Sequence, residues 1–181
     1  MTTLTTTQRE RLAVAVHEAG HAVIGALHGA TVSGLRVLSV VDSEGRNGFC
    51  SYKPFSGPVG AYWGRILAAG PMAEAVFRYG PQFNSGQLAA LLDARHTDRD
   101  ELARLAFSHG GMTVPSTEVL PLLTRCWSSV AELATRLYTH GSATHRDVLD
   151  ALGVPGTSVQ QHHAAAIRSG AVPGSFTVRT G

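Results

Sequence analysis

Residues 7–28 read TQRERLAVAVHEAGHAVIGALH, and this stretch decides the fold prediction. Thr7 and Glu10 have the spacing of a capping box, so we expect a helix with Thr7 as its N-cap. Apolar residues recur at helical intervals and extend the predicted helix to about His28. They are Leu12, Val16, Ala19, Val23 and Leu27. Gly20 costs a helix about 1 kcal/mol relative to Ala, which indicates a reason for the glycine, such as the close approach of another backbone.

The rest of the sequence predicts a mainly α-helical chain with one small β-hairpin. The strands are expected over residues 35–41 and 49–52, because turn-forming residues separate two apolar runs there. Further helices are expected over residues 59–79 with a break at Gly70-Pro71, from 87, from 97, over 116–140 and over 144–152. We therefore expect a flexible N-terminus (1–7), one domain (8–152) and a mobile C-terminal tail (153–181) that is rich in Gly, Pro and Ser.

Composition excludes several classes of protein. The 181 residues carry a net charge of only +2, which is too small for the concentrated basic surface of a nucleic-acid-binding protein. No signal peptide and no apolar run of membrane-spanning length occurs, so we expect a cytoplasmic protein without a membrane segment. Cys50 and Cys126 form no C-x-x-C motif and are expected to be free thiols.

The predicted first helix contains the motif His17-Glu18-Ala-Gly-His21, an H-E-x-x-H. Residues four apart face the same side of a helix, so both imidazoles are able to reach one Zn²⁺ ion. Glu18 lies beside such an ion and is placed to take a proton from a water molecule that the ion activates. The motif therefore predicts zinc ligation by His17 and His21, with Glu18 as the catalytic base.

Catalytic zinc usually has three protein ligands, so the sequence must supply one more. No further histidine follows at the spacing of the extended H-E-x-x-H motif, and His28 lies a full turn too far along the helix to bind the same ion easily. His28 is therefore interpreted as a helix-end histidine, with a role as a ligand or an outer-sphere residue as the alternative. The only downstream stretch that mixes carboxylates with a histidine is Asp93-Ala-Arg-His96-Thr-Asp98-Arg-Asp100.

Several segments resemble, in chain order, the peptidase domain of the FtsH-type ATP-dependent zinc proteases. These are the zinc motif with its following Ala-Val, residues 35–52, residues 69–77, Thr97-Asp98 with residues 101–106, and residues 127–152. The resemblance covers about residues 8–152 and implies the fold of that peptidase domain. It also implies that Asp98 is the third zinc ligand. The family's usual segment before this aspartate, Thr-x-Gly-Ala-x-Asn-Asp, is replaced here by Asp93-Ala-Arg-His96-Thr-Asp98. Asp93 and His96 therefore remain alternative candidates for the third zinc ligand.

The resemblance also suggests roles outside the ligand set. Glu74 lies in the family's Gly-x-x-Ala-Glu segment and is a candidate for orienting a ligand, with a packing or surface role as the alternative. The hairpin either offers an edge strand to an extended peptide or is purely structural. No Gly-x-x-x-x-Gly-Lys-Ser/Thr loop occurs, so we expect no nucleotide site and no ATP-driven unfolding by this chain.

We therefore predict a zinc-dependent endopeptidase that hydrolyses unfolded or flexible proteins, alone or with a partner. The first alternative is a catalytically silent zinc-binding module that binds a protein partner. The second is a helical structural protein without a metal. The sequence leaves the oligomeric state and the substrate open.

Overall fold

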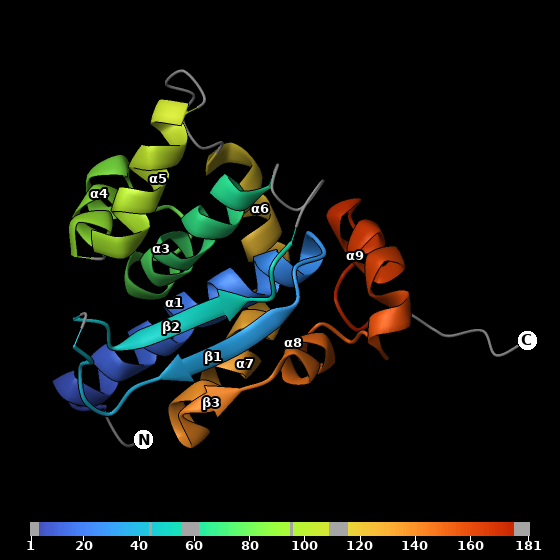
Figure 1. Cartoon of the computed structure of the whole chain (residues 1–181), viewed down its shortest axis with the longest axis horizontal. Coiled ribbons are helices and arrows are strands. Elements are labelled where there is room, and N and C mark those ends of the chain that lie inside the picture. The colour runs from blue at the N-terminus through green and yellow to red at the C-terminus, as the bar shows by residue number, and fades with distance from the viewer. Residues whose placement is uncertain (1–3, 44, 56–61, 95, 109–115, 176–181) are drawn as a thin grey trace, which may run out of the picture.

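The computed structural model describes residues 4–43, 45–55, 62–94, 96–108 and 116–175, without the side chains of residues 96, 116 and 117 (Figure 1). Its helices are α1 (Thr6–Leu27), α3 (Trp63–Tyr79), α4 (Ser85–Ala94), α5 (His96–Ser108), α6 (Ser116–Arg125), α7 (Trp127–His140), α8 (His145–Ala151) and α9 (Gln160–Arg168). Its strands β1 (Val32–Val37), β2 (Gly48–Tyr52) and β3 (Ser142–Ala143) form an antiparallel sheet in the order β2-β1-β3. The predicted class, mainly helical with a small hairpin, is confirmed, and β3 is an addition that the sequence did not predict.

Helix α1 begins two residues earlier than predicted. Its N-cap is Thr5, whose side chain accepts a hydrogen bond from the backbone N–H of Gln8 at 3.2 Å, while the Gln8 side chain accepts one from the Thr5 N–H at 2.9 Å. Thr5 and Gln8 are therefore a capping box of the same spacing as the one expected at Thr7. The expected flexible N-terminus is wrong for residues 5–7, and residues 1–3 lie outside the described part of the chain.

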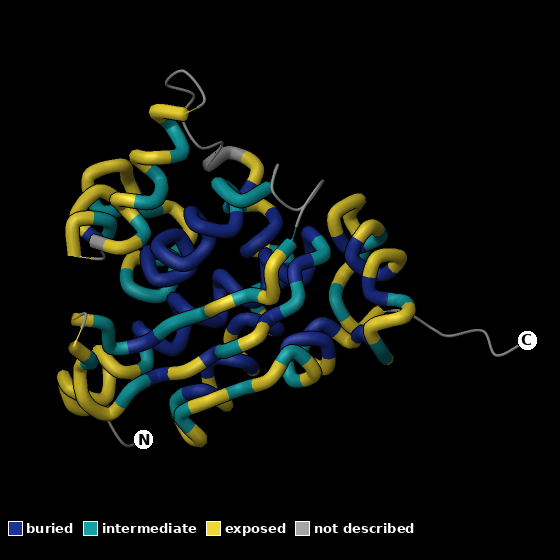
Figure 2. The backbone as a smooth tube through the Cα atoms, in the orientation of Figure 1, coloured by how far each residue is buried: buried dark blue, intermediate teal, exposed yellow. Residues whose placement is uncertain are grey.

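Helix α1 lies at the centre of the molecule. It contacts α3, α7, α9 and both long strands, and every residue from Ala13 to Leu27 is buried (Figure 2). Burial on all sides is typical of a helix in the core of a protein. The sequence predicted only one apolar stripe along this helix, and it therefore underestimated how much of α1 is buried. None of the described helices combines the length and the apolar character that crossing a membrane requires.

Three predicted boundaries are wrong. Helix α3 continues through Pro71 instead of breaking there, because its buried face packs along α1. The single helix expected over 116–140 is divided at Cys126 into α6 and α7, although helical backbone hydrogen bonds join Cys126 to Leu122 and Val130 to Cys126. Strand β1 covers residues 32–37 rather than 35–41; its first residue pairs with Tyr52, and residues 40 and 41 are exposed.

The mobile tail expected from residue 153 is also wrong over the described residues. A short 3₁₀ turn at Thr157–Val159 leads into α9, which packs against α1. Ala164 and Ile167 are buried, and the Gln160 side chain donates a hydrogen bond to the carbonyl oxygen of Ala26 at 2.9 Å. The apolar residues of α9 are few and stand among His and Gln residues, which hid the helical pattern.

Candidate metal centre

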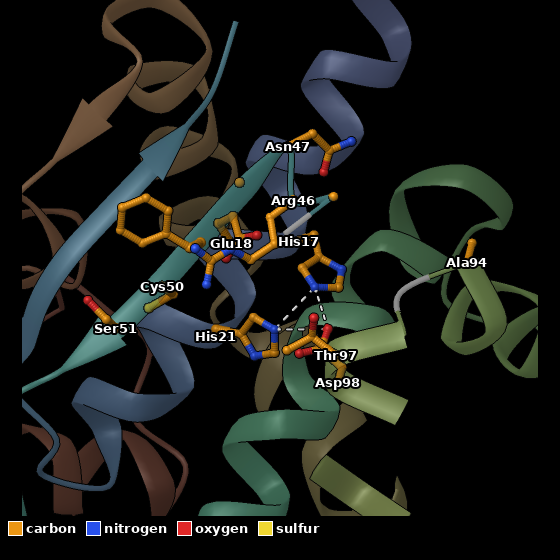
Figure 3. Close-up of a pocket in the computed structure, with 13 residues that line it drawn as sticks. His17, Glu18, His21, Arg46, Asn47, Cys50, Ser51, Ala94, Thr97 and Asp98 are labelled. Atoms are coloured by element: carbon orange, nitrogen blue, oxygen red, sulfur yellow. Dashed lines mark hydrogen bonds and ion pairs between the residues drawn. The ribbon is translucent and has the colours of Figure 1, made fainter. Parts of the chain in front are cut away.

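Three side chains from two helices converge on one point (Figure 3). His17 and His21 project from consecutive turns of α1, and Asp98 projects from the first turn of α5. The Asp98 Oδ2 atom lies 2.8 Å from His17 Nε2 and 3.5 Å from His21 Nε2, and the two Nε2 atoms are 3.1 Å apart. Both imidazoles are buried, and the Asp98 side chain is 15% exposed. The structure thus brings Asp98 to the two histidines across 81 and 77 residues of sequence.

The outward nitrogen of each imidazole is fixed by an acceptor. His17 Nδ1 lies 3.1 Å from Glu74 Oε2, and His21 Nδ1 lies 2.7 Å from the carbonyl oxygen of Ile66. A carboxylate and a carbonyl oxygen only accept hydrogen bonds, so both Nδ1 atoms carry the proton. In the neutral rings both Nε2 lone pairs then face the Asp98 carboxylate, whereas a protonated His17 donates from Nε2 to Asp98 at 2.8 Å. Partners of this kind orient the imidazoles of metal sites.

The three converging atoms of His17, His21 and Asp98 fit the ligands of a small divalent cation. Two Nε2 lone pairs and a carboxylate oxygen are all acceptors, and acceptors held this close repel one another unless positive charge lies between them. Ligands at about 2.0–2.1 Å from a tetrahedral zinc ion are about 3.3 Å from one another. The observed separations of 2.8, 3.1 and 3.5 Å among His17, His21 and Asp98 bracket that value. Two imidazoles and one carboxylate also match the ligands of catalytic zinc sites.

The electrostatics of the cluster favour positive charge. Burial by itself lowers the pKa of His17, but its bonds to Asp98 and Glu74 outweigh that effect and raise the pKa from 6.5 to about 9. Burial raises the pKa of Asp98, but the neighbouring His21 and His17 reverse this, so that its pKa lies well below the usual range. Asp98 is therefore an ionised carboxylate, which is the form that binds a metal.

Glu18 lies beside the cluster, in a cavity of about 320 Å³. The cavity is bounded by α1, by β2 with the loop that precedes it, and by the junction of α4 and α5. The Glu18 side chain is 7% exposed overall and lines the wall opposite Asp98. It packs so closely under Gly48 that a Cβ atom on that glycine would lie 2.9 Å from Glu18 Oε1. The sheet and α1 thus hold this carboxylate next to the cluster.

The other candidate residues lie in different surroundings. Glu74 is 1% exposed and bonds to His17, which excludes the surface role considered for it. The Asp93 side chain is 72% exposed and pairs with Arg99, so it is outside the cluster, while the side chain of residue 96 lies outside the described part of the chain. His28 stacks on Tyr62 at 4.2 Å near the far end of α1, and an outer-sphere role for it is wrong. Seven residues carry it about 10 Å along the helix axis from His21.

Three groups that support the site were not predicted from the sequence: the Ile66 carbonyl oxygen, Arg78 and Glu10. The Ile66 carbonyl oxygen, which holds His21, is a backbone atom without a sequence signature. Arg78 donates to Glu74 Oε1 at 2.8 Å and to both carboxylate oxygens of Glu10 at 2.8 and 2.6 Å. Only the spacing of Glu74 and Arg78, four residues apart on one helix, could have indicated the first of these pairs from sequence.

No protein-family model, curated protein or solved structure matches the chain. The likeness to FtsH-type peptidases therefore rests on the sequence segments alone. Independently of that likeness, the structure shows one buried cluster of two imidazoles and a carboxylate, with a second carboxylate in the adjoining cavity.

Proposed function

We propose that this chain is a zinc-dependent endopeptidase with His17, His21 and Asp98 as the metal ligands and Glu18 as the catalytic base. The observation that carries the proposal is the convergence of two imidazoles and one carboxylate beside a cavity that contains a second carboxylate, Glu18. A zinc ion bound there supplies Lewis-acid activation of water and of the scissile carbonyl group. A merely structural zinc site is usually closed by four protein ligands, whereas the described side chains supply three to this cluster.

The roles of the protein groups follow from their positions. Glu18 accepts a proton from the attacking water and passes it to the leaving amine, since it faces the cavity next to the ligands. Glu74 and the Ile66 carbonyl oxygen hold the imidazoles with their Nε2 atoms directed at the cluster. Burial of both histidines excludes bulk water from behind the site.

An extended peptide fits the position of β2. In the described sheet β2 pairs only with β1, so its other edge carries backbone groups that are able to pair with a further strand. Gly48, Phe49, Cys50 and Ser51 of this strand line the same cavity as Glu18. A substrate chain that pairs with β2 would therefore pass the cluster. Such pairing requires an extended backbone, which favours unfolded or flexible proteins as substrates.

The test is hydrolysis of a fluorescently labelled unfolded casein by the zinc-loaded protein. We expect about one zinc ion per chain, and we expect Glu18→Gln to retain the ion while it loses about 10²–10⁴-fold in rate. The matched control is Glu132→Gln, an exposed glutamate of α7 that should leave the rate unchanged. Wild-type activity in Glu18→Gln contradicts the mechanism. Stoichiometric zinc without any hydrolysis by the wild-type protein would favour the non-catalytic zinc-binding module.

A further inference from the structure

A second cavity, of about 300 Å³, lies at the other end of α1 and shares no lining residue with the metal-centre cavity. It is lined by His28 at the C-terminal end of α1, Arg65 of α3, Glu118 and Arg125 of α6, and Arg168 of α9. Apolar residues of α6 complete the wall. Four helices far apart in sequence thus place four basic side chains and one acidic side chain around one space.

Charge in this cavity is not balanced. Three guanidinium groups face one carboxylate, which leaves two positive charges. Arg65 forms an ion pair with Glu118 and lies over the Tyr62 ring at 5.0 Å, so its guanidinium is held in place. Arg125 and Arg168 donate to carbonyl oxygens at the ends of α9 and α1. Those bonds engage one terminal nitrogen of each, and a guanidinium carries five N–H groups, so donors remain for a ligand.

The His28 side chain lines the same cavity and carries a buried polar atom. Its ring stacks on Tyr62 and is 9% exposed, yet its Nδ1 atom has no hydrogen-bond partner within the described part of the chain. Buried polar atoms without partners are rare in folded proteins, and a bound ion or water is one of the explanations for them. Burial, with the nearby charges of Arg168 and Arg65, lowers the pKa of His28 to about 4, so the ring is neutral at pH 7 and is able to donate one N–H.

We propose that this cavity binds a phosphate group, either as free inorganic phosphate or as part of a small phosphorylated molecule. The two uncompensated positive charges match a dianion, and a tetrahedral oxyanion offers acceptor oxygens in several directions, as donors from Arg65, Arg125, Arg168 and His28 require. A carboxylate has one charge and two oxygens in one plane, and it fits this arrangement less well. The site is independent of the metal centre and of the peptidase activity.

The test is calorimetric titration of the full-length protein with inorganic phosphate, at constant ionic strength. We expect saturable binding with one site per chain, and binding at least tenfold weaker in Arg65→Gln and in His28→Phe, which keeps the stacked ring but removes its N–H. The matched control is Arg104→Gln, an exposed arginine of α5 paired with Glu101, which should bind as the wild-type protein does. Circular dichroism of each variant shows whether its fold is retained.

Parallel titrations identify the ligand class and its source. Tighter binding of glycerol 3-phosphate than of phosphate identifies a small phosphorylated molecule as the source, whereas equal or weaker binding identifies free phosphate, and both support the site. Acetate binding as tight as phosphate binding overturns the assignment to phosphate. Absence of saturable binding, or equal binding by the folded Arg65→Gln and wild-type proteins, overturns the site itself; the latter result would place the phosphate elsewhere, such as at the metal ligands.

Discussion

The buried carboxylate of Glu74 joins His17, a proposed metal ligand, to the protein surface. One of its oxygens bonds to His17 and the other to Arg78, which in turn holds the exposed carboxylate of Glu10. A carboxylate that is 1% exposed needs such partners, because an unpaired buried charge is strongly destabilising. Arg78 thereby holds the Glu74 carboxyl group in a position directed at His17. Its own pKa is raised above the usual range by Glu10 and Glu74.

We predict that Glu74→Gln weakens zinc binding about 10–100-fold, which is the usual effect of losing a partner of a metal-ligating histidine. The amide has no charge to stabilise the His17 ring and presents an NH₂ group to either His17 or Arg78. Competition with a chromogenic chelator measures the affinity. Glu10→Gln should have a smaller effect, since Glu10 is exposed and acts through Arg78. An affinity in Glu74→Gln equal to that of Glu132→Gln contradicts the orienting role.

At the scale of single residues, the sequence predicted the three residues of the cluster better than it predicted the groups that orient them. His17 and His21 were predictable because helical spacing alone sets their common direction. Asp98 followed from a resemblance, and local spacing left Asp93 and His96 equally available. Glu74 contacts His17 across 57 residues, and Ile66 contributes only its backbone, so no local pattern could have assigned either contact.

Close contact between α1 and α3 is the packing feature on which the metal centre depends. A Cβ atom at Gly20 would lie 2.6 Å from the Cβ of Ala73 and 2.7 Å from the carbonyl oxygen of Ala69. The close backbone approach predicted from a mid-helix glycine is therefore confirmed. On the facing helix, a Cβ atom at Gly70 would overlap the His21 ring. Both glycines are needed for space, which lets α3 bring Glu74 and the Ile66 carbonyl group to the histidines.

We predict that Gly20→Ala lowers the free energy of unfolding by about 2 kcal/mol. Alanine gains about 1 kcal/mol in helix propensity, but overpacking against a backbone carbonyl that cannot move aside costs about 3 kcal/mol, the upper end of its usual range. Urea denaturation followed by circular dichroism measures the change. Gly86→Ala in exposed α4 is the control and should be neutral or slightly stabilising, since its nearest contact is a side-chain oxygen at 3.3 Å. If Gly20→Ala and the wild-type protein had equal free energies of unfolding, α1 and α3 would be able to move apart to admit the methyl group without loss of stability, and the prediction would be wrong.

Among the elements, strong periodicity was read correctly and tertiary packing explains the failures. Helix α8 begins after the predicted Thr144, which forms a capping box with Asp147. The division at Cys126 was missed because the apolar stripe continues through it, with Leu123 and Val130 both buried. Helix α9 was missed because it is stabilised by α1 and by polar caps such as Arg125 on the Ile167 carbonyl oxygen.

In the whole molecule, burial is unevenly distributed around the metal centre. The helices α1, α3 and α7 contain most of the buried residues, whereas Leu91 is the only buried residue in α4 and none of the described side chains of α5 is buried (Figure 2). Helices α4 and α5 contact α3 and each other. The link from α5 to the core at the cluster is Asp98, which bonds to His17. An ion bound by His17, His21 and Asp98 would therefore attach a weakly packed pair of helices to the core.

We predict that removing zinc with a chelator increases amide hydrogen exchange mainly in α4 and α5, by about tenfold or more, while the centre of α1 and α7 stays protected. Segments with few buried apolar contacts open locally at low free energy, and a ligand present at 100 times its Kd stabilises the closed form by about 2.7 kcal/mol. Hydrogen exchange with mass spectrometry, with and without zinc, resolves the helices separately. Asp98→Asn should show the same pattern without a chelator, because an amide binds zinc poorly.

Two results would contradict this arrangement. Equal acceleration in all helices would mean that the ion stabilises the fold globally, as in small domains that fold only with metal. Unchanged exchange in α4 and α5 after complete zinc removal would mean that packing on α3 alone holds these helices, and that Asp98 is not needed to keep α5 in place. The predicted pattern requires instead that α5 separates from the core more easily than α1 and α3 separate from each other. This difference in the ease of separation is expected because the contact of Gly20 with Ala69 and Ala73 is buried, whereas the residues around Asp98 are exposed.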